Sequence, residues 1–164
     1  MKKNQGKKNW WPKFKNAKKR GEWAELVFAS RAIELGLDLA KPWGDSSGYD
    51  FTVDQGMRIV RVQVKCTIAR KNTGYICALL STGRPYKSNT FEFVAAYVIP
   101  EDTWYIIPER RVRGQWNVGL YPNLEKAKYR AYQEAWHLLR GEATRGIEIQ
   151  ACAEMVAVAP TCLE

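Results

Sequence analysis

The side chains best suited to chemistry are a carboxylate, an amide and an ammonium group that follow one another along the chain. Asp50 lies in a short strand-like segment, and Gln63 and Lys65 lie two residues apart in a longer one. Alternate residues of a strand point to the same face, so Gln63 and Lys65 stand side by side. The opposite face takes the apolar residues of that run, Val60, Val62, Val64 and Cys66. An amide and a lysine on a central strand need a polar destination, and a cleft that holds a carboxylate and a metal provides one.

Two helical segments flank these residues. Apolar residues at a spacing of three to four predict a helix over 21–36. Its apolar stripe consists of Trp23, Leu26, Ser30, Ile33 and Leu37. Other apolar residues of the segment lie off that stripe, as in a helix that packs on two sides at a subunit interface. A second helix is predicted over 124–140, between an N-cap at Asn123 and a stop at Gly141.

The segments between the two helices predict a sheet, so the fold class is α/β (α+β). The runs 49–54 and 58–68 are joined by a short turn and predict a β-hairpin. Further strands are expected over 75–80, 91–99 and 103–107. The hairpin therefore carries the candidate residues into the sheet.

The order of these residues resembles the PD-(D/E)XK nuclease superfamily. The matching elements are G-E-W-A-E, which ends in Glu25, and S-G-Y-D, which ends in Asp50. Gln63-Val64-Lys65 stands in place of the (D/E)-X-K tripeptide. The sequence is most similar to group I intron-encoded homing endonucleases of this type, in which glutamine replaces the second acid, and it also resembles archaeal Holliday junction resolvases. The resemblance implies a restriction-endonuclease-like fold, with a central mixed β-sheet flanked by helices.

The resemblance also implies a catalytic set of Glu25, Asp50, Gln63 and Lys65 that works with Mg²⁺, for which Mn²⁺ could substitute. Asp50 is the expected central metal ligand. The Gln63 side-chain carbonyl and the Val64 backbone carbonyl are expected as further ligands, and Glu25 as a ligand either directly or through water. Lys65 is expected to position or activate the attacking water and to stabilise developing negative charge.

Helix periodicity alone does not decide which glutamate of the first helix belongs to the site. Glu22 lies closer than Glu25 to the apolar stripe, which is centred on Leu26. Geometry alone therefore makes Glu22 a rival for the site, whereas the resemblance favours Glu25.

The positive charge is concentrated at the N-terminus. The formal net charge is +9, and residues 1–20 hold nine cations and no acid, so the rest of the chain balances to zero. The chain divides into this basic arm, a nuclease domain over 21–141 and a C-terminal extension over 142–164. The extension contains an apolar run, 147–158, that is either a strand or part of a loosely held tail. A basic arm suits a polyanion, and double-stranded DNA is the expected partner, although a solubilising tail is the alternative.

Candidate nucleic-acid contacts come from the arm and from three basic clusters in predicted loops. They are Lys13, Lys15, Lys18, Lys19, Arg20, Arg70, Lys71, Arg84, Lys87, Arg110, Arg111 and Arg113. Loops around a sheet could bring these side chains to phosphates. Trp10, Trp11 and Phe14 in the arm favour binding or docking over a purely solubilising role. Trp43 and Tyr86 are candidates either for DNA contact or for ordinary packing.

Several other classes of protein are disfavoured. The four cysteines form no C-x-x-C pair and have no neighbouring histidine, so reduced thiols are expected and a zinc site is not. The single histidine, His137, is expected on a helix flank and not as the base of a hydrolase. No apolar run is long enough to span a membrane and no secretory signal is recognised, which predicts a cytoplasmic protein without membrane contact.

These features predict a metal-dependent DNA endonuclease of the site-specific homing type. A junction-resolving nuclease with the same chemistry and a catalytically inactive DNA-binding protein on the same fold are the alternatives. One active site cuts one strand, so cutting both strands calls for two copies and predicts a homo-oligomer, a dimer or a tetramer.

Overall fold

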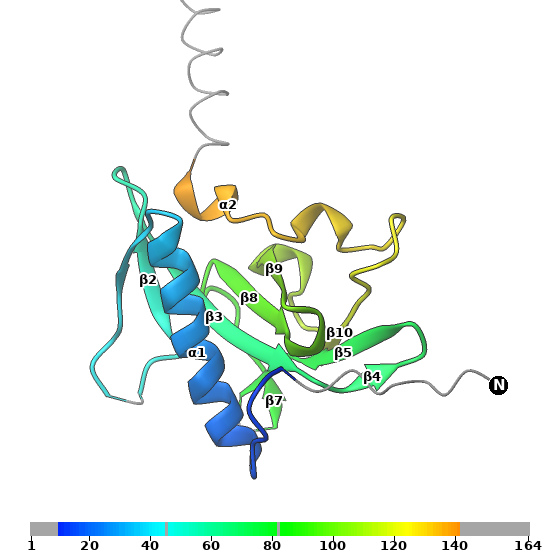
Figure 1. Cartoon of the computed structure of the whole chain (residues 1–164). Helices are drawn as coiled ribbons and strands as arrows, with labels where there is room; N and C mark the ends of the chain where they lie inside the picture. The colour runs from blue at the N-terminus through cyan, green and yellow to red at the C-terminus, as the bar shows by residue number, and fades with distance from the viewer. Residues whose placement is uncertain (1–9, 45, 82, 142–164) are drawn as a thin grey trace, which may run out of the picture.

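A mixed five-stranded sheet forms the centre of the molecule. The structure is a computed structural model that describes residues 10–44, 46–81 and 83–141. The strands in spatial order are β1 (Asp38–Ala40), β2 (Phe51–Asp54), β3 (Ile59–Thr67), β8 (Phe93–Val98) and β9 (Thr103–Pro108). β3 and β8 are parallel, and the other neighbours are antiparallel. The predicted fold class, with a mixed sheet and flanking helices, is therefore confirmed (Figure 1).

Smaller elements surround this sheet. A second sheet consists of β10 (Asn117–Leu120), β5 (Gly74–Ala78) and β4 (Arg70–Lys71), and a separate hairpin consists of β6 (Leu80–Ser81) and β7 (Arg84–Pro85). The short helices are η1 (Ile99–Glu101), η2 (Glu109–Arg111), η3 (Arg130–Tyr132) and α2 (His137–Arg140). The strand predicted over 75–80 is divided between β5, which ends at Ala78, and β6, which begins at Leu80; between them, the Leu79 N–H donates to the Trp116 carbonyl (2.9 Å).

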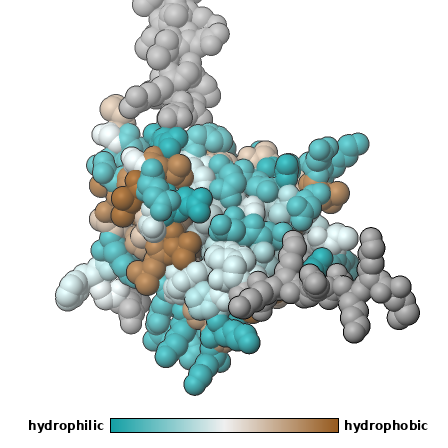
Figure 2. All heavy atoms as spheres, viewed as in Figure 1, coloured by the Kyte–Doolittle hydropathy of each residue, from teal (hydrophilic) through white to brown (hydrophobic). Residues whose placement is uncertain are grey.

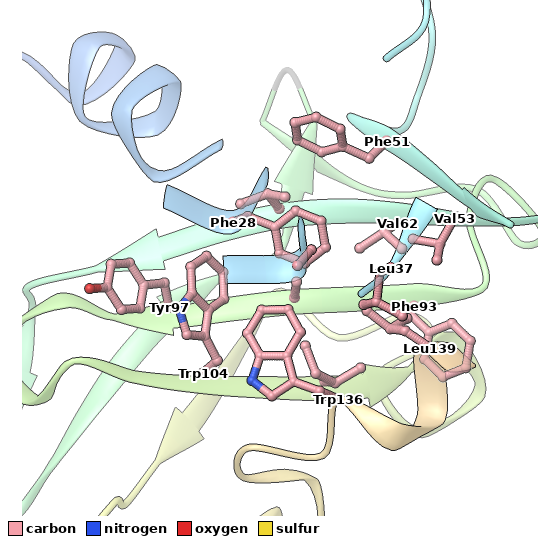
Figure 3. Close-up of a cluster of buried hydrophobic side chains, with 14 of the residues drawn as sticks. Phe28, Leu37, Phe51, Val53, Val62, Phe93, Tyr97, Trp104, Trp136 and Leu139 are labelled. Atoms are coloured by element: carbon pink, nitrogen blue, oxygen red, sulfur yellow. The ribbon is translucent and has the colours of Figure 1, made fainter. Parts of the chain in front are cut away.

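The two faces of the central sheet are covered by different layers. On one face, Phe28 of α1 (Ala17–Glu34) packs against Phe51, Trp104 and Trp136, with ring centroids 5.4–5.6 Å apart (Figure 3). On the other face, the second sheet packs against β8 and β9. β8 is buried on both faces, which explains its unbroken apolar sequence.

Helix α1 begins four residues earlier than predicted. The Asn16 side chain caps the helix by accepting a hydrogen bond from the Lys19 N–H (2.8 Å), and this cap starts the helix at Ala17. Lys18, Lys19 and Arg20 therefore lie in its first turns. The predicted stop at Gly36 agrees with its left-handed backbone (φ 74°).

The predicted apolar stripe of α1 is wrong. The buried residues are Ala24, Phe28 and Ala32, which follow one another at every fourth position, whereas Leu26 and Ile33 are 70% and 64% exposed. Two small alanines let the helix backbone lie close to the sheet, and Phe28 supplies the bulk between them. The larger aliphatic residues consequently point away from the core, and brown spheres gather over the middle of α1 in Figure 2.

The helix predicted over 124–140 is also wrong. Residues 121–136 form turns and a 3₁₀ helix, and only His137–Arg140 is α-helical. Glu134 adopts a φ of 51° and pairs with Trp104: its N–H donates to the Trp104 carbonyl (2.8 Å), and its carboxylate accepts from the Trp104 N–H (2.7 Å). Bonding to the edge of β9 thus outweighs local helix propensity.

The remaining expectations concern single residues. Cys66 and Cys77 are free thiols, as predicted, and burial raises the pKa of Cys77 to about 12. His137 is exposed on α2, in agreement with a helix-flank position. Cys152, Cys162 and the whole predicted extension 142–164 lie outside the described residues. Among the residues that are described, no helix is long and apolar enough to cross a membrane.

Candidate active site

Asp50 lies where β2 separates from the edge of β3. Its backbone N–H donates to the Val62 carbonyl (2.9 Å), and β2 begins to pair with β3 at Phe51 opposite Val62. Beyond Val62, β3 continues without β2 beside it, which leaves backbone groups of β3 available to a side chain. The Asp50 carboxylate uses one of them and accepts a hydrogen bond from the Val64 N–H at 2.7 Å.

The Gln63 amide lies between two oxygen atoms. Its Nε2 donates to Asp50 Oδ2 and, at 3.2 Å, to the Val64 carbonyl, and the side chain is buried. A carboxylate oxygen and a carbonyl oxygen thus converge on one positively polarised group. A cation in that position would meet the same two oxygens, and rotation of the amide would turn its own oxygen toward the cation.

Lys65 lies on the same face of β3 as Gln63, as strand alternation requires. Its Nζ donates to the Leu80 carbonyl at 3.2 Å and lies 5.0 Å from the centre of the Tyr86 ring. Both contacts come from the β6–β7 hairpin and its flank, so the end of this side chain is held from outside its own sheet.

Glu25, and not Glu22, faces Asp50. The Glu25 side chain is 22% exposed and pairs with Lys41 at 2.7 Å, whereas Glu22 is 57% exposed and lies 4.0 Å from Lys18. The true buried face explains the difference. At about 100° per residue, Glu25 lies about 60° from Phe28 around the helix, and Glu22 lies about 120° away.

The charge of Asp50 is controlled by burial and by its neighbours. The pKa of Asp50 is raised to about 6, and burial is the largest cause. The Val64 N–H lowers this pKa, the nearby Glu25 charge raises it, and Lys65 and Lys41 lower it. Two carboxylates drawn together and partly removed from water gain stability from a bound cation.

The donor atoms fit a hard divalent cation. Asp50 and Glu25 supply carboxylates, Val64 supplies a carbonyl, and Gln63 can supply an amide oxygen. Mg²⁺ takes one or two protein carboxylates and completes its shell with water and substrate oxygens. The described residues contain no group of three or more His, Cys, Asp or Glu that could hold a metal, so an all-protein cage of zinc type is not formed by them.

Part of the basic set lies near these residues. Arg84 and Lys87 are exposed on the hairpin that contacts Lys65 and on the loop after it. Both β7 and the start of α1, which carries Lys18 and Lys19, lie toward the bottom of Figure 1. Lys13 and Lys15 precede that helix, Arg20 lies in its first turns, and Arg70 and Lys71 are exposed on β4.

Of the arginines around η2, Arg113 lines a small pocket beside Tyr86, whereas Arg110 lies farther from the candidate site. Arg113 pairs with Glu109 at 2.7 Å, and Arg111 donates to the Tyr132 hydroxyl at 2.9 Å. Arg110 lines a cavity of about 320 Å³ together with Arg58, which immediately precedes β3. Lys65 lies seven residues further along that strand, a distance of about 23 Å.

Arm aromatics contact the chain's own core. Trp11 packs against the core cluster, and Phe14 contacts Trp23 with ring centroids 5.2 Å apart. Trp43 is fully exposed. Residues 1–9, with their four lysines, lie outside the described part of the chain.

The contacts of Lys41 with Glu25 and of Tyr86 with Lys65 are features of the candidate site that sequence reasoning missed. Lys41 stands in the irregular segment before Asp50, and nothing in its spacing ties it to Glu25. The Tyr86 ring reaches Lys65 only because the β6–β7 hairpin folds toward β3. Neither feature belongs to a periodic element, so periodicity gave no signal for it.

The two helix acids should respond differently to loss of charge. Glu25→Gln is expected to slow DNA cleavage about 10- to 100-fold, because it removes the second carboxylate near Asp50. Glu22→Gln is the matched control on the same helix and should stay within about twofold of wild type. Single-turnover cleavage at saturating protein measures both. A larger loss of rate for Glu22→Gln than for Glu25→Gln would mean that Glu22, and not Glu25, is the helix acid of the site.

Comparison with known proteins agrees with this arrangement. The family model for PD-(D/E)XK endonuclease matches residues 15–139. A solved structure of a bacterial homing endonuclease, I-Ssp6803I, is similar with a TM-score of 0.66 and 27% sequence identity, covering 82% of this chain and 98% of that chain. No curated protein matches. On the extent of the family match, which includes every residue of the candidate site, the chain belongs to the PD-(D/E)XK endonuclease family.

Proposed function

We propose that this nuclease hydrolyses phosphodiester bonds in double-stranded DNA at defined sequences, with Mg²⁺ as its metal and Mn²⁺ as a substitute. The observation that carries the proposal is the convergence of the Asp50 carboxylate, the Gln63 amide and the Val64 carbonyl, with Lys65 on the same strand face. Family membership supports the reaction class. The likeness to a bacterial homing endonuclease supports duplex DNA with a defined target as the substrate.

Asp50, Glu25, the Val64 carbonyl and the Gln63 amide oxygen are the groups that would hold the metal. When bound there, Mg²⁺ supplies a water of lowered pKa and a positive charge beside the scissile phosphate. The Val64 N–H fixes the orientation of the Asp50 carboxylate through their 2.7 Å hydrogen bond. Lys41 fixes Glu25 in the same way through the 2.7 Å ion pair.

Lys65 acts on the reacting atoms directly. An ammonium group carries three N–H donors and no acceptor. One of them is engaged by the Leu80 carbonyl, which leaves the others for the attacking water and for a phosphate oxygen. Donors already in place where negative charge develops lower the barrier without reorganising during the reaction.

Cleavage of genomic DNA, followed by sequencing of the new ends, tests the proposed function. Mg²⁺ should produce ends that share one sequence, and removal of divalent metal should abolish them. A synthetic four-way junction and a linear duplex of the same sequence are compared in parallel. Cleavage of the junction alone would favour a resolving nuclease, and binding without cleavage in Mg²⁺ and Mn²⁺ would contradict an enzymatic function.

The protein is also proposed to act as a homo-oligomer. Leu26 and Ile33 are spaced two turns apart on α1 and are both exposed, which offers a second copy an apolar contact surface. Replacing both with glutamate should weaken association at least 100-fold, because two apolar contacts are lost in each copy. Sedimentation equilibrium measures the association.

Leu124→Glu is the control for this prediction, since Leu124 is exposed outside α1. It should leave the oligomer intact. A wild-type protein that is monomeric both alone and on DNA would refute the proposal.

The basic arm is proposed to contact DNA phosphates. Trp11 packs on the core, Phe14 contacts Trp23 and Asn16 caps α1, so truncation would disturb the fold. Replacing Lys13, Lys15, Lys18 and Lys19 with glutamine removes charge instead. If all four lysines engage phosphates, the slope of log K against log salt should become shallower by about 3 to 4. Equilibrium binding in Ca²⁺ measures the slope, and Lys126→Gln with Lys128→Gln is the control. An unchanged slope would leave the arm as a solubilising segment.

A further inference from the structure

We infer that the β6–β7 hairpin positions the catalytic lysine, and that Tyr86 is the positioning residue. The inference rests on the proposed function, because it takes Lys65 as the residue that acts on the reacting atoms. The hairpin belongs to neither of the larger sheets. It reaches across to β3, so the orientation of Lys65 depends on a separate element.

Two contacts hold the end of the Lys65 side chain. The Leu80 carbonyl, at the start of the hairpin, accepts a hydrogen bond from Nζ at 3.2 Å. The Tyr86 ring, just after the hairpin, lies 5.0 Å from Nζ, within the range of a cation–π attraction. A lysine head sits on a flexible four-carbon stem, so two contacts at its end restrict it far more than its strand position does.

Tyr86 is itself held in place. Its ring meets the edge of Phe91 in a T-shaped contact with centroids 5.0 Å apart. Phe91 is buried in the core between the central sheet and the second sheet. The core therefore holds Phe91, Phe91 holds the Tyr86 ring, and the ring restricts the position of the Lys65 ammonium group.

The same hairpin offers groups to DNA. Arg84 lies in β7 and Lys87 follows Tyr86, and both are exposed. The groups proposed to bind phosphate and the ring proposed to orient Lys65 thus lie within one short segment.

Two substitutions of Tyr86 distinguish the contribution of its ring from that of its hydroxyl. Tyr86→Leu should lower the single-turnover cleavage rate about 10- to 100-fold, because the Lys65 ammonium group loses the cation–π contact that orients it. Tyr86→Phe keeps the ring and should stay within about threefold of wild type. DNA binding measured in Ca²⁺ should change less than about threefold in both. Equal rates for Tyr86→Leu and wild type would overturn the inference.

Ring fluorination provides a test that leaves the shape of the side chain almost unaltered. Phenylalanine analogues with increasing fluorine substitution at position 86 have a progressively weaker attraction for cations. The cleavage rate should fall stepwise along this series. A constant rate would mean that Tyr86 only fills space, which contradicts the inference even if Tyr86→Leu is poorly folded.

A double variant distinguishes positioning from general stability. In a Lys65→Met background, Tyr86→Leu should cause no further loss of rate, because its effect passes through the lysine. A structural role would cost the same factor in both backgrounds. Ser88→Ala, at an exposed position two residues after Tyr86, is the matched control, and it should leave both the rate and DNA binding within about twofold of wild type.

The outcomes also separate this inference from the proposed function. If Lys65→Met cleaves at the wild-type rate, the proposed catalytic role of Lys65 fails. If Lys65→Met is slow but neither Tyr86→Leu nor fluorination changes the rate, only the positioning role of Tyr86 fails.

Discussion

Asp50→Asn is expected to abolish metal-dependent cleavage, with a loss of roughly 1,000-fold or more. The substitution keeps the size of the side chain, and its amide oxygen can still accept the hydrogen bond from the Val64 N–H. The substitution removes the negative charge of the central proposed metal ligand. Single-turnover cleavage in Mg²⁺ and in Mn²⁺ measures the loss, and duplex binding in Ca²⁺ should stay within about tenfold of wild type.

Asp54→Asn is the matched control for Asp50→Asn. Asp54 ends β2, the strand that Asp50 immediately precedes; it is exposed and accepts a hydrogen bond from the Gly56 N–H in the β2–β3 turn (2.7 Å). Its substitution should leave the cleavage rate within about twofold. Cleavage by Asp50→Asn within tenfold of wild type would contradict the proposed metal site.

Lys65→Met should have the second largest effect, a loss of about 100- to 1,000-fold in single-turnover rate. Methionine retains an unbranched side chain of similar length but has no donor for the water or the phosphate. Metal affinity should remain, because Asp50, Gln63 and Val64 are unchanged. Cleavage assays across a Mg²⁺ titration separate the two effects: the maximal rate falls and the midpoint stays.

Lys71→Met tests whether any exposed lysine near the sheet would behave in the same way. Lys71 lies at the end of β4 and is exposed. Its loss should weaken DNA binding slightly and leave the maximal rate unchanged. A Lys65→Met variant whose rate recovers at high Mg²⁺ would instead make Lys65 part of the metal site.

The central elements of the fold could be predicted because their sequence pattern reports burial directly. β3 alternates apolar and polar residues, and the structure buries Val60, Val62 and Val64 on the face toward α1. That alternation alone places Gln63 beside Lys65. The approach of Asp50 to both depends on β2 leaving the edge of β3, a tertiary feature that only the resemblance indicated.

The errors have a common physical origin. Residues 124–140 have helical spacing, but a bond to the edge of β9 through Glu134 decides their conformation. On α1, small Ala24 and Ala32 occupy the buried face and larger aliphatic residues lie outside it. In each case a tertiary contact overrides the local pattern, and the second case determines which helix acid faces Asp50.

The most direct test of the metal site is the anomalous scattering of Mn²⁺ in crystals of the Lys65→Met protein bound to duplex DNA. This variant keeps the proposed ligands and slows turnover, so the cation and the intact phosphate can be seen together. The expected result is an anomalous peak about 2.0–2.3 Å from an Asp50 carboxylate oxygen, with the Val64 carbonyl also in its coordination shell. A peak bound by other residues, or none at this position while DNA is in place, would contradict the proposed active site.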